Sequence, residues 1–219
     1  MRLAGVRIGS GDLPAAIAAY ELLLQLPGSP LPEGGRRFRL ERGRVDVVAG
    51  EPGLRSVCFV GDAADATLPA ALGIDVTVEP EDEAAGRPGP GPAIDHVVVH
   101  TVDPARAITL WRDRLGLRLA LDREFPDRHL RLLFFRSGGI TLEYACPLPV
   151  PAGEPVSDRL YGVSYRVPDL VARRERLLAS GVDVSEVRRG MRPGTSVATV
   201  RSGTAGVPTL LLQVDGAPG

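Results

Sequence analysis

Apolar and polar residues alternate along this chain in a unit that is repeated. The clearest copy begins with the alternating stretch IDHVVVHT, residues 94–101, and continues with an amphipathic run that ends at Leu115-Gly116-Leu117. Alternation with period two predicts a half-buried strand, and a spacing of three and four predicts a helix. Further extended stretches follow and end at ITLEYA, residues 140–145. The pattern predicts a strand-helix-strand-strand-strand unit, two copies of which can curl around a shared cleft.

A second copy begins with LYGVSYRV at residue 160, continues through the helical run DLVARRERLLASG, and ends at TLLLQV. Two weaker copies precede these. The first starts with LAGVRIGS and a helix from Asp12, and the second has RSVCFVG, a short helix over residues 63–72, and GIDVTV. Asp12 and Asp103 are suitable N-caps, and Pro104 fits the first helical position, where its missing N–H costs nothing.

The domain organisation follows from these copies and from one change in composition. The segment 81–92 is rich in Pro, Gly and acidic residues, which is typical of an exposed linker. Residues 1–80 are expected to form a shortened half. Residues 93–215 are expected to form the fuller domain, made of the modules 93–147 and 158–215.

Composition excludes several classes of function. The formal net charge is -1 and no basic stripe is present, so no nucleic-acid partner is expected. No apolar run is long enough for a membrane span, and the N-terminal residues lack the apolar core of a signal peptide, so we expect a cytoplasmic protein with Cys58 and Cys146 as free, buried thiols. The chain has no lysine, which excludes Schiff-base and P-loop chemistry, and no organic cofactor is expected. Trp111 and Tyr20 occupy matching helix positions and are expected in the core.

The stretch IDHVVVHTVDPARAITLWRDRLGL, the closing strand LEYA and the later ASGVDV resemble the vicinal-oxygen-chelate superfamily. That superfamily includes glyoxalase I, bleomycin-resistance proteins and type I extradiol dioxygenases. The resemblance is good over residues 94–214 and weak over residues 2–79. It implies an α+β fold in which paired βαβββ modules form an open, cleft-bearing barrel. It also implies a homodimer.

The same resemblance implies candidate metal ligands. Metal-dependent members take one ligand from the first strand and one from the last strand of each unit. His96 and Glu143 fill these positions in the unit that starts at residue 94, whereas the next unit offers Gly162 and either Leu210 or Leu211. An imidazole and a carboxylate suit Fe, Mn, Ni, Co or Zn.

Two protein ligands are few for a catalytic metal, which generally has three. A third could come from His129 or from a partner subunit. The alternative is that His96 and Glu143 form a hydrogen-bonded pair in a cleft without metal.

Substrate-binding residues are expected beside this pair. Alternation places His100 on the same strand face as His96, about 13 Å away. Ser164 and Arg166 share the face of Gly162, so the three side chains His100, Ser164 and Arg166 can line a polar cleft for an anionic or carbonyl ligand. Two alternatives stay open, namely that Arg166 is a salt-bridged strand residue and that His100 is a strand-end histidine near solvent.

We therefore expect a protein that acts on a small oxygenated organic molecule through a divalent metal, as a lyase, isomerase or dioxygenase. The missing ligands argue against ordinary lactoylglutathione lyase activity. The alternative is a metal-free protein that binds and sequesters a small molecule in the same cleft. In a third reading, the N-terminal half is purely structural and replaces a second subunit at the sheet edge.

Overall fold

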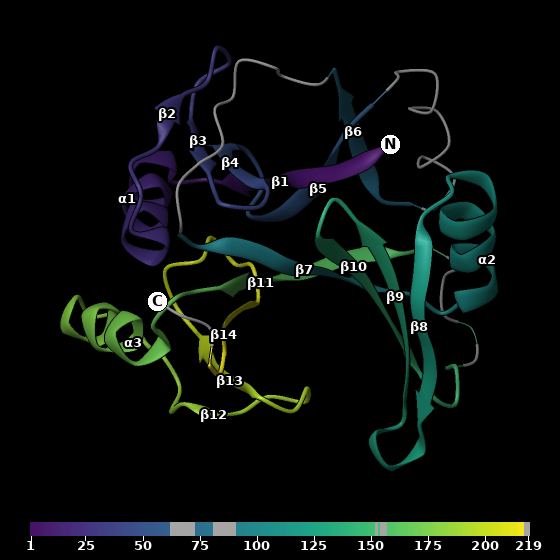
Figure 1. Ribbon diagram of the computed structural model, residues 1–219. Helices are drawn as coiled ribbons and strands as arrows, with labels where there is room; N and C mark the ends of the chain where they lie inside the picture. Colours follow the sequence, from purple (N-terminus) through teal and green to yellow (C-terminus); the bar gives the residue numbers. More distant parts are fainter. Residues whose placement is uncertain (62–72, 81–90, 152, 154–156, 217–219) are drawn as a thin grey trace.

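The computed structural model describes residues 1–61, 73–80, 91–151, 153 and 157–216. Two mixed sheets account for all the described strands (Figure 1). The first sheet has six strands in the order β2-β3-β4-β1-β5-β6. Its strands are β1 (Arg2–Ser10), β2 (Ser29–Pro30), β3 (Arg36–Arg39), β4 (Arg44–Ala49), β5 (Gly53–Val60) and β6 (Asp75–Glu79).

The second sheet has eight strands in the order β12-β13-β14-β11-β7-β10-β9-β8. Its strands are β7 (Ala93–His100), β8 (Arg118–Phe125), β9 (Leu130–Ser137), β10 (Ile140–Pro147), β11 (Arg159–Arg166), β12 (Arg188–Arg189), β13 (Thr195–Val200) and β14 (Thr209–Val214). Strands β7 and β11 lie antiparallel at its centre. Each also pairs in parallel with the last strand of its own unit, β10 or β14. The repeat expected from the sequence is therefore present as a pair of units joined through their first strands.

Three helices start at aspartate caps. They are α1 (Leu13–Leu24), α2 (Pro104–Ile108) and α3 (Leu170–Ala179). The caps are Asp12, Asp103 and Asp169, and each side chain accepts a hydrogen bond from the backbone N–H three residues later. After α2 the chain widens into a π-helical segment, η3 (Thr109–Arg114), so the helix expected over this stretch has two parts. A short 3-10 turn, η4 (Pro126–Arg128), joins β8 and β9.

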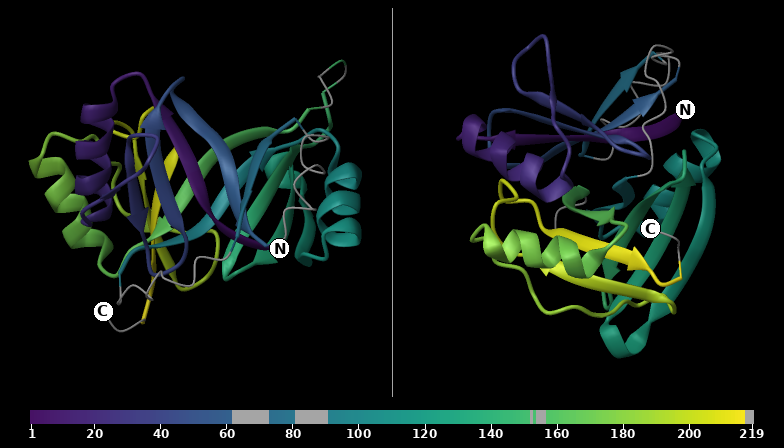
Figure 2. Two further views of the ribbon diagram at one scale, coloured as in Figure 1. Left: turned by 90° about the horizontal axis from the view of Figure 1, so that it is seen from above. Right: turned by 60° about the vertical axis from the view of Figure 1, so that its left-hand side comes forward.

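The predicted α+β class and open arrangement are confirmed. In Figure 1 the first sheet lies above the second, with α1 and α3 at one side and α2 at the other, and Figure 2 shows the same layers from two further directions. The hairpin between β9 and β10 turns through Gly138 and Gly139, which have positive φ values of 62° and 80°. Both angles suit glycine, which has no side chain to clash in this conformation.

The segment VDVSEVRR, residues 182–189, is paired only in part with β13. A bridge at Val184 and the two-residue β12 pair with that strand. The reason is local, because the Ser185 hydroxyl accepts from the Thr199 N–H and the Ser202 hydroxyl from the Asp183 N–H, so side chains replace ladder bonds. The helix expected at residues 63–72 and residues 81–90 of the expected linker lie outside the described residues.

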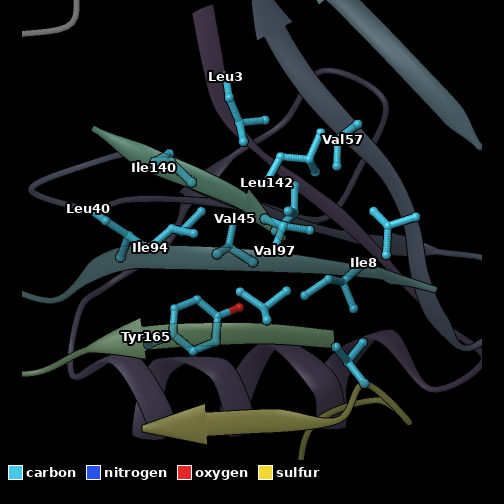
Figure 3. Close-up of a cluster of buried hydrophobic side chains, with 14 of the residues drawn as sticks. Leu3, Ile8, Leu40, Val45, Val57, Ile94, Val97, Ile140, Leu142 and Tyr165 are labelled. Carbon is cyan, nitrogen blue, oxygen red and sulfur yellow. The ribbon is translucent and has the colours of Figure 1, made fainter. Parts of the chain in front are cut away.

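One apolar cluster lies between the two sheets. Figure 3 shows how side chains of β1, β4 and β5 meet those of β7, β10 and β11. The first sheet contributes Leu3, Ile8, Val45 and Val57, and the second contributes Ile94, Val97, Ile140, Leu142 and Tyr165, all of which are almost completely buried. Because strand side chains alternate, this packing uses one face of the second sheet and leaves the other for solvent or a ligand.

Aromatic residues extend the cluster toward α2. Trp111 stacks on Phe59 of the first sheet with ring centroids 5.5 Å apart, and its indole N–H donates to the Tyr144 hydroxyl at 2.7 Å. Tyr20 donates from its hydroxyl to the Thr204 carbonyl at 3.2 Å. Both predicted core aromatics are fully buried.

The two cysteines are free and buried, as expected. No helix of the described residues has both the length and the apolar character needed to cross a bilayer.

The Phe59–Trp111 stack makes the coupling of the two sheets measurable. We expect Phe59→Ala and Trp111→Ala each to lower the free energy of unfolding by about 3–5 kcal/mol. The double variant should lose less than the sum by about 0.5–1.5 kcal/mol, because the rings contact each other. Urea unfolding measures both, with the exposed Leu178→Ala as control. Strict additivity would contradict this coupling.

Candidate functional site

The face of the second sheet turned away from the core cluster is called the open face here. On β7 it bears His96, Val98 and His100, which are partly exposed, whereas Val97 and Val99 on the other face are buried. Strand order places β10 on one side of β7 and β11 on the other. The open face therefore combines side chains from both units, as expected from the repeat.

A β-bulge in β7 sets the orientation of His96. Ser164 pairs with His96 but Tyr165 pairs with Ile94, so Asp95 is an extra residue in the ladder. The bulge leaves Asp95 beside His96, and its carboxylate lies 2.9 Å from His96 Nδ1. A carboxylate only accepts, so Nδ1 carries the proton and Nε2 of the neutral ring is an acceptor.

Glu143 completes this group from the adjacent strand β10. Its Oε2 lies 3.9 Å from His96 Nε2. Burial raises the pKa of the Glu143 carboxyl, and the Asp95 charge adds to this while His96 opposes it. Burial also disfavours ionised Asp95, but the hydrogen bond and charge of His96, with Arg192 and Arg136, hold the Asp95 pKa below its usual range. In this arrangement Nε2 can take a proton from a bound molecule whenever the His96 ring is neutral.

The donor set does not fit a resident metal held by three protein ligands. Among the described residues, no group of three or more His, Cys, Asp or Glu side chains could hold an ion. His129, the expected third ligand, is not brought beside His96 and Glu143. At Gly162 a Cβ atom would lie 2.5 Å from the Pro208 carbonyl oxygen, so the backbone leaves no room for a ligand side chain. Leu210 of β14 pairs with Ser164 of β11, and its side chain has no atom that could bind a metal.

A hollow of about 220 Å³, called the His96 hollow, opens beside this group. Its walls come from β7, β11, β13 and β14, and include His96, Val98, Tyr161, Gly162, Ser164, Thr199 and Leu210. Ser164 is only 1% exposed, and its hydroxyl has no hydrogen-bond partner among the residues that the structure describes. A buried hydroxyl left unpaired costs about 1–3 kcal/mol, so a ligand oxygen that accepts from it would be stabilised.

A larger hollow of about 560 Å³, called the His100 hollow, lies at the other end of β7. His100, His129 and Arg159 line it together with Leu130 and Ala145. The Tyr161 ring stacks on the His100 ring with centroids 4.1 Å apart. Since Tyr161 also lines the His96 hollow, the stacked pair forms the wall between the two hollows.

The structure separates the three expected substrate residues. Ser164 lies in the His96 hollow and His100 in the other. Arg166 lines neither of them and instead pairs with Glu41 of the first half, at 2.7 Å from Nη2 to Oε1. This is the salt-bridged alternative that the sequence left open.

Sequence reasoning missed Asp95, Arg159 and Tyr161. Strict alternation places Asp95 on the core face, and only the bulge brings it to His96. An aspartate directly before the first-strand histidine was the available signal. Arg159 and Tyr161 precede Gly162 on β11, and their relation to His100 depends on the β7–β11 register, which the sequence does not specify.

Comparison with known proteins finds a family match for the second half of the chain. Residues 95–199 match the sequence model of the Glyoxalase/Bleomycin resistance protein/Dioxygenase superfamily. This match confirms the resemblance for that region. No curated protein matches the chain.

Among solved structures, a triple mutant of 4-hydroxymandelate synthase from Streptomyces coelicolor is 15% identical. The match covers 100% of this chain and 94% of that one, with a TM-score of 0.71. Methylmalonyl-CoA epimerase from Mycobacterium tuberculosis is 21% identical over 57% of this chain and 87% of that one, with a TM-score of 0.45. A variant of the Streptomyces coelicolor epimerase is 18% identical over 57% of this chain and 96% of that one, with a TM-score of 0.46. The synthase shows that the fold is shared over the whole chain.

The raised pKa of Glu143 makes stability depend on pH. The native carboxyl keeps its proton at a pH where the unfolded one, with a pKa of about 4.3, has lost it. The free energy of unfolding therefore falls as pH rises above about 4.3 through the raised native pKa. We expect Glu143→Gln to raise the Tm relative to the wild type at about pH 8, and to make little difference at about pH 4.

Thermal unfolding of both proteins across this range measures the effect. The control Glu175→Gln removes a carboxylate at an exposed position of α3. A Glu143→Gln difference of equal size at both ends of the range would contradict the burial argument.

Proposed function

We propose that this chain, whose residues 95–199 carry the signature of the Glyoxalase/Bleomycin resistance protein/Dioxygenase superfamily, binds a small oxygenated organic molecule on its open face without a resident metal. The observation that carries the proposal is that Ser164 lines the His96 hollow while its buried hydroxyl has no hydrogen-bond partner among the described residues. His96 lies opposite on β7, and Asp95 orients its ring.

The two polar groups suit a molecule with neighbouring oxygens. The Ser164 hydroxyl can donate to a carbonyl oxygen, and His96 Nε2 can accept from a hydroxyl. The remaining walls are largely apolar and include Val98 and Leu210. A small hollow with apolar walls and few polar groups is typical of small-molecule sites. If the bound molecule has an acidic proton, His96 is placed to act as general base.

The second candidate is an enzyme that uses a divalent metal at His96 and Glu143. The 3.9 Å separation of the two side chains supports it, because both could reach one ion. The number of donors and the steric block at Gly162 count against it. The proposed protein partner is a second copy of the chain. The homodimer, the cytoplasmic location and the division into residues 1–80 and 93–215 stay predictions.

Metal content separates the two candidates. Protein purified without chelators should contain far less than one metal ion per chain by elemental mass spectrometry. The His96→Ala variant should contain the same amount, because no third ligand accompanies His96 and Glu143 in the described part of the chain. A nearly stoichiometric metal that disappears in His96→Ala would replace the first candidate by the second.

Ligand binding tests the role of Ser164. The probe is acetoin, a small molecule with adjacent hydroxyl and carbonyl groups, titrated by calorimetry. We expect Ser164→Ala to weaken binding about two- to tenfold, as for the loss of one neutral hydrogen bond. The stability of the variant should be unchanged or higher, because the orphaned hydroxyl is removed.

Ser196→Ala is the matched control, since its hydroxyl pairs with Asp215 outside both hollows. Equal affinity of the wild type and Ser164→Ala for acetoin, or no binding to the wild type at all, would count against the proposed site.

A further inference from the structure

We infer that the His100 hollow holds the anionic group, a carboxylate or a phosphate, of the molecule whose oxygenated end occupies the His96 hollow. This inference rests on the proposed function, because one ligand spans both hollows. The carrying observation is a cluster of three nitrogen-bearing side chains, namely His100, His129 and Arg159, in one hollow.

Among the described residues, the lining of the His100 hollow includes the cationic side chain of Arg159, two imidazoles and no acidic side chain. Arg159 contacts His100 but pairs with no carboxylate in the part of the chain that the structure describes. Other arginines on the strands of this sheet do have a carboxylate partner, as Arg131 has Asp122 and Arg166 has Glu41. An arginine without a counter-ion, on the wall of a hollow, is suited to bind a carboxylate or phosphate with its forked donors.

His100 adds a donor to this cluster. Arg159 lies opposite His100 in the β7–β11 ladder, with its Nη2 3.4 Å from His100 Nδ1. Because a guanidinium only donates, Nδ1 accepts, and the neutral ring carries its proton on Nε2. Burial lowers the pKa of His100, and the Arg159 charge lowers it further. A bound anion would offset that charge, so both groups favour an anionic ligand.

His129 is held in position by its backbone. Its N–H donates to the Pro126 carbonyl at 3.0 Å, and its carbonyl accepts from the Leu148 N–H at 2.8 Å. Its φ is 52°, a left-handed conformation that is uncommon for residues other than glycine. The loop between β8 and β9 is thereby tied to the end of β10, and the imidazole is presented at the hollow.

The two hollows are close enough for one molecule. His96 and His100 lie four residues apart on one face of β7, which is about 13 Å. Tyr161 forms the wall between them and is 42% exposed, so a chain of a few carbons can lie against its ring. The geometry therefore selects a ligand with an oxygenated group at one end and an oxyanion at the other.

The test compares 7-oxooctanoate with its uncharged counterpart 8-hydroxyoctan-2-one by calorimetry. We expect the wild type to bind the carboxylate about ten- to a hundredfold more tightly, as for one charge-assisted hydrogen bond. Arg159→Gln should abolish this preference and leave the affinity for the alcohol unchanged. His129→Asn, which tolerates the left-handed backbone, should reduce the preference in part.

Arg112→Gln is the control, because it removes the same charge from an exposed arginine that pairs with Asp113 on the helical segment η3. Inorganic phosphate and acetate then compete with bound 7-oxooctanoate, and the stronger competitor identifies the preferred oxyanion. Equal affinity of the wild type for the two probes, a preference that survives Arg159→Gln, or no binding of either oxyanion would overturn the inference.

Ser164→Ala distinguishes this inference from the proposed function. If Ser164→Ala weakens the binding of both probes while Arg159→Gln changes neither affinity, the site in the His96 hollow is supported and the anion site is contradicted. If Arg159→Gln abolishes the preference while Ser164→Ala has no effect, the anion site stands and the proposed carbonyl contact fails.

Discussion

The structure depends on the apolar cluster shared by the two sheets. Leu3, Ile8 and Val57 of the first sheet cover Val97 and Leu142 of the second. A sheet with one face packed must turn its alternate side chains the other way, so this packing decides which residues can form a site. The first half covers the face opposite to the one that bears His96, Glu143 and Ser164, so it contributes packing to the sheet that carries the candidate site.

Within that register, one irregularity has a large chemical effect. The bulge at Asp95 places a carboxylate next to the imidazole on a strand that would otherwise direct it into the core. Bulges are common where a strand must re-aim a side chain. The result is that Nδ1 of His96 is held by the Asp95 carboxylate, while Nε2 is left to accept a hydrogen bond. The same strand ends four residues later at His100. Its neighbour is the positively charged Arg159, whereas the neighbour of His96 is a carboxylate.

Much of the fold could be predicted from the sequence, because alternation, aspartate caps and Gly-Gly turns are local signals. The units around β7 and β11, the caps Asp12 and Asp103 and the burial of Trp111 all follow from such signals. The pairing of His96 with Glu143 was predicted too, although only through a family resemblance. The contacts of Asp95 and Arg159 were not predicted, since they depend on a bulge and on the strand register. A salt bridge of Arg166 was one of the alternatives, but its partner Glu41 was not predicted, because that contact joins the two halves. None of these has a local signature.

Gly162 has a consequence for how this fold could gain or regain chemistry. Any side chain there would collide with the Pro208 carbonyl oxygen. No single substitution at that position can install a donor, because the turn before β14 would have to move first. A protein that had lost a metal ligand at this position could therefore not regain it by one substitution of the glycine. An engineer who wanted a third donor would begin at Leu210, on the neighbouring strand, where a side chain already lines the hollow.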